Sequence, residues 1–136
     1  MACISVKSFF IFIVLSLYLV NPTQAKIDSF QKHRISVYNK FPRNSKALVV
    51  RCQSNDDDLG VRAIYPDQGF DWSFRTNFAE TTIFFCHVWW EAKQASFQVF
   101  NANWIKVYET YNYVVNIDGF YVQNDREPYF KKIGTW

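Results

Sequence analysis

Cysteine is scarce in this sequence, and long apolar runs are scarcer still. The 136 residues include three cysteines and one extended apolar segment, which lies near the N-terminus. No Asn-x-Ser/Thr site occurs in which x is not proline, so N-glycosylation is not expected. The chain also lacks a Gly-x-Ser-x-Gly elbow, a phosphate-binding loop and a His-Glu-x-x-His motif. These absences argue against the enzyme classes that depend on such motifs.

A strong charge of one sign is lacking as well. Lys and Arg total 15 against 12 for Asp and Glu, which gives a net charge of +3. Lys131-Lys132 is a pair of basic residues, whereas nucleic-acid-binding proteins concentrate many on one face. We therefore expect no nucleic-acid partner.

Residues 1–25 have the composition of a secretory signal peptide. Lys7 precedes a twelve-residue apolar run at 9–20, and the segment ends in small residues at Ala25. A helix that spans a bilayer needs about 20 such residues, so the run is too short for an anchor. We expect cleavage after Ala25, secretion, and no membrane insertion afterwards. The remaining residues, 26–136, have the size of one domain, which we expect to be a monomer.

Removal of the signal peptide would take Cys3 with it and leave Cys52 and Cys86. In an oxidising compartment this pair predicts a disulfide. The closed loop would contribute about 3–4 kcal/mol to stability. Two free buried thiols, or half of a metal site, are the alternatives. The nearest further ligand, His87, should point to the opposite sheet face from Cys86, so we expect the disulfide and neither a metal nor a cofactor.

Alternation of apolar and polar residues organises the chain after the N-terminal segment. Phe70, Trp72 and Phe74 alternate with polar residues, which is typical of a half-buried strand. Turn-forming residues recur about every ten positions, and no amphipathic helix interrupts them. The pattern predicts an all-β fold, an antiparallel β-sandwich of about eight short strands. The expected strands are residues 33–39, 47–54, 61–65, 70–75, 81–90, 95–100, 105–108, 113–117 and 129–133.

Aromatic residues are abundant, with 14 Phe, 8 Tyr and 5 Trp. We expect most of them in the core, because a small domain needs large side chains to bury enough apolar area. Trp89 and Trp90 are neighbours in an expected strand and must point to opposite faces, so at most one lies fully in the main core. An exposed tryptophan could instead stack on sugar rings. A lectin-like module that binds cell-wall carbohydrate is therefore the alternative function.

Asp56, Asp57 and Asp58 form an acidic turn that ends at Gly60. Clustered carboxylates can bind calcium. Three consecutive residues point in different directions, however, and the spaced ligands of a calcium loop are missing. We expect a solvated turn in which one aspartate accepts hydrogen bonds from backbone N–H groups and Gly60 has a positive φ.

His33 and His87 are the only histidines. An acid–base nuclease would need both to converge on one phosphate. Their flanking residues lack the histidine-containing motifs of secreted plant ribonucleases. We expect His87 to be packed and hydrogen-bonded beside Trp89, and we expect no catalytic residue and no enzyme activity.

Two motifs are specific when they occur in this order. The first is a cysteine followed by an acidic Asp-Asp-Leu-Gly turn, and the second is a Thr-Ile-Phe-Phe-Cys strand. With the segments around them, these motifs resemble the plant self-incompatibility S-protein homologue family. The matching residues are 38–39, 48–60, 70–74, 82–90 and 118–121.

The resemblance implies a small secreted β-sandwich that acts as a ligand for an extracellular or cell-surface receptor protein. In the founding case such a ligand triggers the arrest of incompatible pollen. Family members usually carry a second cysteine pair, but here residues 111–115 have tyrosines where cysteine and tryptophan would be expected. We expect the edge near residues 108–113 to be looser as a result.

Loops on a rigid scaffold commonly contain the residues that bind a partner. We therefore expect the receptor to contact polar residues in the loops at 40–45, 55–60, 65–69 and 91–95. The expected contact residues are Arg43, Asn44, Asp56, Asp57, Asp58, Asp67, Gln68, Glu91 and Lys93.

Overall fold

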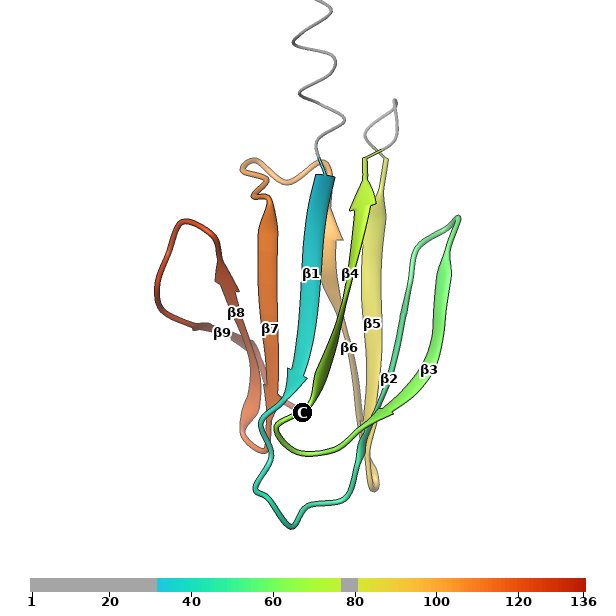
Figure 1. Ribbon diagram of the computed structural model, residues 1–136, viewed down its shortest axis with the longest axis vertical. Coiled ribbons are helices and arrows are strands. Elements are labelled where there is room, and N and C mark those ends of the chain that lie inside the picture. Colours follow the sequence, from blue (N-terminus) through green and yellow to red (C-terminus); the bar gives the residue numbers. More distant parts are fainter. Residues whose placement is uncertain (1–31, 77–80) are drawn as a thin grey trace, which may run out of the picture. The chain divides into compact units, whose positions relative to one another are not determined.

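Strand follows strand throughout the part of the chain that the computed structural model describes, residues 32–76 and 81–136 (Figure 1). The expected signal peptide, residues 1–25, lies outside the described residues. Residues 26–31, the start of the expected domain, lie outside them as well. Within the described ranges, no helix is long and apolar enough to cross a membrane.

The described residues form nine strands and no helix, which confirms the all-β fold that the alternating pattern predicts. Most of the expected strands are present, with ends that differ by a few residues. The strands are β1 (Lys32–Asn39), β2 (Leu48–Gln53), β3 (Asp58–Ile64), β4 (Gly69–Arg75), β5 (Ile83–Trp90), β6 (Lys93–Asn101), β7 (Thr110–Asn116), β8 (Gly119–Asn124) and β9 (Lys131–Gly134).

Two sheets pack face to face. One has five strands in the order β4-β1-β7-β8-β9, and the other has four in the order β3-β2-β5-β6. Neighbouring strands are antiparallel except for β1 and β7, which run parallel with Arg34 opposite Thr110. A parallel pair cannot be closed by a tight hairpin, which is why these two strands lie far apart in the sequence. The antiparallel sandwich is confirmed, with one parallel pairing inside the larger sheet.

The core lies between the two sheets, where the alternating residues meet. Ile35 and Val37 on β1, and Leu48 and Val50 on β2, are fully buried. Burying an aliphatic side chain of this size contributes about 1.5–3 kcal/mol relative to leaving it exposed. The inward faces that the sequence predicts for these two strands are therefore confirmed.

Aromatic rings fill much of the same core. The ring of Phe74 on β4 lies 4.6 Å from that of Phe84 on β5 and 4.8 Å from that of Phe100 on β6, measured between centroids. Phe97 stacks on Phe120 across the sandwich at 4.9 Å. The expectation that most aromatic residues serve the core holds for these rings.

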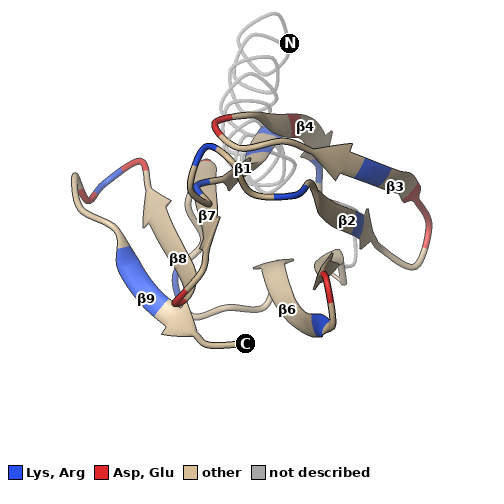
Figure 2. Ribbon diagram, turned by 90° about the horizontal axis from the view of Figure 1, so that it is seen from below, with Lys and Arg blue, Asp and Glu red and all other residues tan. Residues whose placement is uncertain are grey.

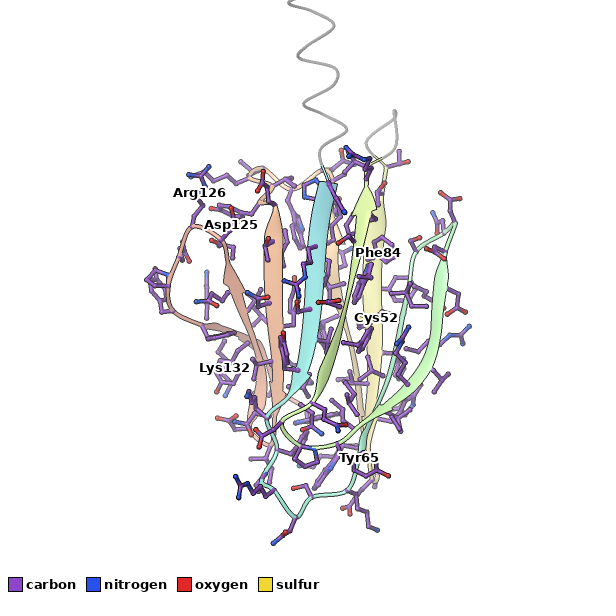
Figure 3. The ribbon with its side chains drawn as sticks, viewed as in Figure 1. Cys52, Tyr65, Phe84, Asp125, Arg126 and Lys132 are labelled. Atoms are coloured by element: carbon purple, nitrogen blue, oxygen red, sulfur yellow. A yellow bond between two sulfur atoms is a disulfide. The ribbon has the colours of Figure 1, made fainter. Side chains whose placement is uncertain are left out.

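Cys52 and Cys86 form the expected disulfide. They lie directly opposite each other on β2 and β5, with Cα atoms 4.0 Å apart, and both are fully buried. Figure 3 shows Cys52 and Phe84 in the interior of the sandwich. The bond therefore ties neighbouring strands of one sheet and closes a sequence separation of 34.

The segment between β6 and β7 differs from the prediction. It is irregular, so the expected strand at residues 105–108 is wrong. Ile105 is fully exposed, so its apolar side chain does not face the core as the predicted strand would require. β8 was not expected, although Phe120 is buried and Val122 packs against the core on its inward face. Because β7 is the central strand of its sheet, Tyr111 and Tyr113 do not lie at a sheet edge, contrary to expectation.

Candidate functional site

Three connecting segments meet at one end of the sandwich, the lower end in Figure 1. They are the β1–β2 loop (residues 40–47), the β3–β4 turn (65–68) and the β5–β6 turn (91–92). Figure 2 looks at this end and shows basic and acidic residues interspersed on the turns, and Figure 3 places Tyr65 there. We call these segments, together with Lys93, the loop-end surface. It brings together the predicted contact residues Arg43, Asn44, Asp67, Gln68, Glu91 and Lys93.

Asn39, the last residue of β1, holds the loop-end surface in place. Its side chain is fully buried, and its Nδ2 donates to the carbonyl oxygen of Ile64 at 2.9 Å. Its Oδ1 accepts from the backbone N–H of Phe41 at 2.8 Å. Its backbone N–H donates to the carbonyl of Gln68 at 2.9 Å, and its carbonyl accepts from the N–H of Asp67 at 2.8 Å. One residue therefore joins the β1–β2 loop, the end of β3 and the β3–β4 turn.

The β3–β4 turn carries Asp67 at a position that favours glycine. The backbone N–H of Gln68 donates to the carbonyl of Tyr65 at 3.0 Å, with Pro66 second and Asp67 third in the turn. Asp67 has a φ of 65°, the pattern of a type II turn, whose third position is usually glycine or asparagine. Its Oδ1 lies 3.6 Å from the Nζ of Lys40. The turn is thereby connected to the β1–β2 loop through side chains as well.

The β5–β6 turn also has an acidic residue with a positive φ that pairs with a lysine of the β1–β2 loop. Trp90 pairs with Lys93, so the loop between the two strands has two residues, of which Glu91 is the first. Glu91 has a φ of 52°. A two-residue hairpin with a positive φ at its first central residue prefers glycine there. The Oε1 of Glu91 lies 3.7 Å from the Nζ of Lys46, which comes from the β1–β2 loop.

An aromatic cluster supports the β1–β2 loop from the core side. Phe41 is buried, stacks on Trp90 at 4.6 Å and lies 6.1 Å from Trp136 between centroids. The indole N–H of Trp90 donates to the carbonyl of Lys46 at 3.2 Å, and that of Trp136 to the carbonyl of Asn116 at 2.9 Å. The backbone of the loop is therefore fixed while its polar side chains face solvent.

The acidic turn lies at the opposite end of the sandwich, so Asp56, Asp57 and Asp58 are not part of the loop-end surface (Figure 1). Asp58 has a structural role: its Oδ2 lies 2.5 Å from Nη2 of Arg51, and its Oδ1 accepts from the N–H of Gly60 at 2.9 Å. The hydrogen bond from Arg51, followed by that from Gly60, lowers the pKa of Asp58. Gly60 has a φ of 79°, and both expectations for this turn are confirmed.

The described residues include no group of three or more His, Cys, Asp or Glu placed to hold a metal ion. His33, on the five-stranded sheet, is buried with its Nδ1 2.7 Å from the carbonyl oxygen of Tyr108. His87, on the outer face of the four-stranded sheet, stacks on Trp89 at 4.1 Å and contacts Gln94 at 3.0 Å. The two histidines lie in different sheets and do not converge on one site, which acid–base chemistry on a phosphate would require.

The family model described as plant self-incompatibility protein S1 matches residues 34–136. The chain belongs to this family. The family resemblance that the motifs predict is thereby confirmed.

Two full-length relatives support the assignment to the plant self-incompatibility family. S-protein homolog 21 of Arabidopsis thaliana is 29% identical over 131 residues, which cover 92% of this chain and 94% of that protein. S-protein homolog 29 of the same plant is 27% identical over 137 residues, which cover 93% and 95%.

A solved structure of the self-incompatibility protein homologues has the same fold. It superposes with a TM-score of 0.63 at 14% identity and covers 78% of this chain and 95% of its own. Its title describes a widespread family of small, highly stable, secreted proteins from plants. The secretion expected from residues 1–25 agrees with that description.

Two tyrosines occupy the stretch in which this family member lacks a second cysteine pair. Tyr111 and Tyr113 on β7 are both buried. The hydroxyl of Tyr113 donates to the carbonyl of Val99 on β6 at 2.7 Å, and the hydroxyl of Tyr111 accepts from the N–H of Tyr108 at 2.8 Å. Burial raises the pKa of the Tyr113 phenol far above its usual value. A hydrogen bond across the sandwich therefore connects the two sheets here.

The residues that fix the loop-end surface, above all Asn39 and Phe41, were not predicted from the sequence. One local signal was available, because an asparagine at the end of a strand often accepts a hydrogen bond from the backbone two residues later. The bond from Asn39 to Ile64 spans 25 residues and leaves no local signal. Lys40 and Lys46 were likewise not predicted, because their partners come from other turns.

Proposed function

We propose that this protein is a secreted, non-enzymatic ligand whose loop-end surface binds a receptor protein on the surface of a plant cell. Membership of the plant self-incompatibility family supports the general kind of function. The fixed backbone of the loop-end surface supports this particular surface, since recognition loops are commonly held by a rigid scaffold.

One observation carries the proposal. Among the described residues, Asp67 and Glu91 are the non-glycine residues with positive φ, and both lie in the loop-end surface. Such backbone conformations cost about 1–3 kcal/mol each and cluster at functional sites. The exposed ion pairs that these two residues make return at most about 1 kcal/mol each. The ion pairs therefore do not offset the cost of the backbone conformation, which supports a role for these acidic side chains in recognition.

The loop-end surface also offers positive charge to a partner. Arg43 and Lys93 are exposed, and neither takes part in a salt bridge of the described residues. Charges at the rim of an interface accelerate encounter and select partners of opposite charge. We infer a receptor surface that carries carboxylates opposite these two residues.

Charge reversal at matched positions tests the proposal. The double variant Arg43→Glu/Lys93→Glu should weaken saturable binding of the labelled, oxidised protein to target plant cells by about tenfold, a free-energy change of about 1.4 kcal/mol. The control Lys106→Glu/Arg126→Glu changes the net charge equally, at exposed positions of the other end of the sandwich. It should bind as the unchanged protein does. Equal effects of the two double variants would contradict a specific site at the loop-end surface.

The acidic turn remains a second possible contact surface, because Asp56 and Asp57 are exposed. The variant Asp56→Asn/Asp57→Asn tests this surface and leaves Asp58, which the fold uses, unchanged. If this variant abolishes binding while Arg43→Glu/Lys93→Glu does not, the receptor contacts the acidic end instead.

A carbohydrate-binding role is favoured by one feature of the outer face of the four-stranded sheet. Trp89 is partly exposed there, stacked on His87 and next to Gln94, which pairs with it across the strands. An aromatic ring beside an amide is an arrangement on which a sugar can stack and form hydrogen bonds. If this role holds, cell-wall oligosaccharides should quench tryptophan fluorescence, and Trp89→Ala should abolish the effect.

A further inference from the structure

A cavity of about 340 Å³ opens between the edges of the two sheets. It lies where β6 of the four-stranded sheet faces β7, β8 and β9 of the five-stranded sheet. Its volume falls within the range of small-molecule sites in proteins, roughly 300–1,000 Å³. The cavity is lined by Phe97, Gln98, Trp104, Tyr111, Tyr113, Val122, Asn124 and Ile133.

The cavity is distinct from the loop-end surface. Tyr111 is the second residue of β7, whereas the other end of that strand, Asn116, lies at the loop end. Trp104 belongs to the connection between β6 and β7, at the far end from the β1–β2 loop (Figure 1). The cavity therefore shares no lining residue with the receptor contact proposed above.

Aromatic rings form the walls of the cavity. Trp104 lies 5.6 Å from Tyr111, and Phe97 lies 5.8 Å from Tyr113, measured between ring centroids. The hydroxyl groups of both tyrosines are engaged in the hydrogen bonds to Val99 and Tyr108. These bonds fix the positions of the two tyrosine rings, so the aromatic walls of the cavity are preformed.

Among the described residues that line the cavity, none has a charged side chain. Its polar side-chain groups outside the tyrosines and the tryptophan are the amides of Gln98, which is exposed, and Asn124. The Oδ1 of Asn124 is fixed by the backbone N–H groups of Arg126 and Glu127, at 2.8 and 3.0 Å. An ionised ligand would lose the hydration of its charge here and find no opposite charge in return. An uncharged ligand does not incur this cost.

We propose that this cavity binds a small, uncharged molecule built on a flat aromatic ring. Its ring packs against Trp104, Tyr111 and Phe97 in offset or edge-to-face contact, the geometries that aromatic pairs prefer. A single polar group on the ligand reaches the amides of Gln98 and Asn124. The occupant is a free small molecule, in contrast to the macromolecular partner of the loop-end surface.

Binding of the neutral dye N-phenyl-1-naphthylamine to the purified protein, with its disulfide intact, tests the proposal. We expect saturable one-site binding, with enhanced dye emission and reduced tryptophan emission. Val122→Phe adds a ring inside the cavity and should weaken binding by about tenfold or more. The matched control Val61→Phe makes the same change at an exposed position of β3 and should leave binding unchanged.

A second variant keeps the test decisive if Val122→Phe disturbs the core. Ile133 lies on the edge strand β9, lines the cavity and is 42% exposed, so Ile133→Lys should fold normally. The new charge at the cavity should also weaken dye binding by about tenfold. Absence of saturable binding would overturn the proposal, as would binding that neither cavity variant weakens or that Val61→Phe weakens equally.

Discussion

The side-chain Nδ2 of Asn39 donates a hydrogen bond of 2.9 Å to the backbone carbonyl of Ile64, and so joins the end of β1 to the end of β3. These two strands belong to different sheets. The bond therefore fixes the five-stranded sheet against the four-stranded sheet at the loop-end surface. The geometry of the candidate site therefore depends on a buried amide, which is not itself one of the proposed receptor contacts.

Replacing this amide should destabilise the fold. Asn39→Ala leaves the Ile64 carbonyl and the Phe41 N–H without their partner, and each buried polar group left unpaired costs about 1–3 kcal/mol. We expect a loss of about 2–4 kcal/mol in the free energy of unfolding, measured by urea denaturation. Asn44→Ala, at an exposed position of the adjoining loop, should change it by less than about 0.5 kcal/mol. A similar small change for Asn39→Ala would contradict the role assigned to it.

Glycine at position 91 should relieve backbone strain. Glu91→Gly removes a side chain from a residue with a φ of 52° and loses only an exposed ion pair. We expect the free energy of unfolding to rise by about 1 kcal/mol. Ser96→Gly, at an exposed position within β6, should lower it by about 0.5–1 kcal/mol. A stability that falls equally in both variants would show that Glu91 is not strained.

The same Glu91→Gly variant separates stability from recognition. If Glu91 contacts the receptor, binding to target cells should fall while stability rises. Binding that stays unchanged would remove Glu91 from the proposed contact residues and leave the remaining loop-end residues to be tested separately.

The Arg51–Asp58 pair should make stability depend on pH in the acid range. The pKa of Asp58 is lowered in the folded protein from its ordinary value of 3.8. Its contribution is therefore present above that value and is lost as the pH falls through the lowered pKa. Asp58→Asn should reduce stability near neutral pH, and the difference from the unchanged protein should shrink below about pH 4.

Urea denaturation at a series of acid pH values measures this effect. Asp56→Asn is the matched control, because Asp56 lies in the same turn and takes part in no salt bridge of the described residues. A difference for Asp58→Asn that stays constant across the acid range would count against the ion pair as its source.

Loss of the disulfide should cost more than the loss of an exposed ion pair. Cys52→Ala/Cys86→Ala removes a bond that spans a sequence separation of 34, and we expect a loss of about 3–4 kcal/mol. Peptide mapping by mass spectrometry without reductant should recover the two cysteines in one linked fragment. Free thiols at both positions in the purified protein would refute the bond.

The alternation of Phe70, Trp72 and Phe74, and the fully buried Ile35 and Val37, show what could be read locally. Period-two patterns report the face of each residue, because successive side chains of a strand point to opposite sides. The irregular segment around Ile105 shows the limit. Ile105 and Val107 flank Lys106, an alternation that suggests a strand. Whether such a segment pairs with a neighbouring strand depends on the rest of the fold.

Local patterns in the chain were enough to predict the strand-rich fold, the cysteine pair and the family, because alternation, composition and short motifs can each be recognised within a short stretch. The folded protein alone shows that β1 pairs parallel with β7, that Asn39 reaches Ile64, and that the acidic turn lies away from the other predicted loops. These relationships join residues far apart in the chain. They arise when the two complete sheets pack together. No single stretch of the sequence therefore contains a signal for them.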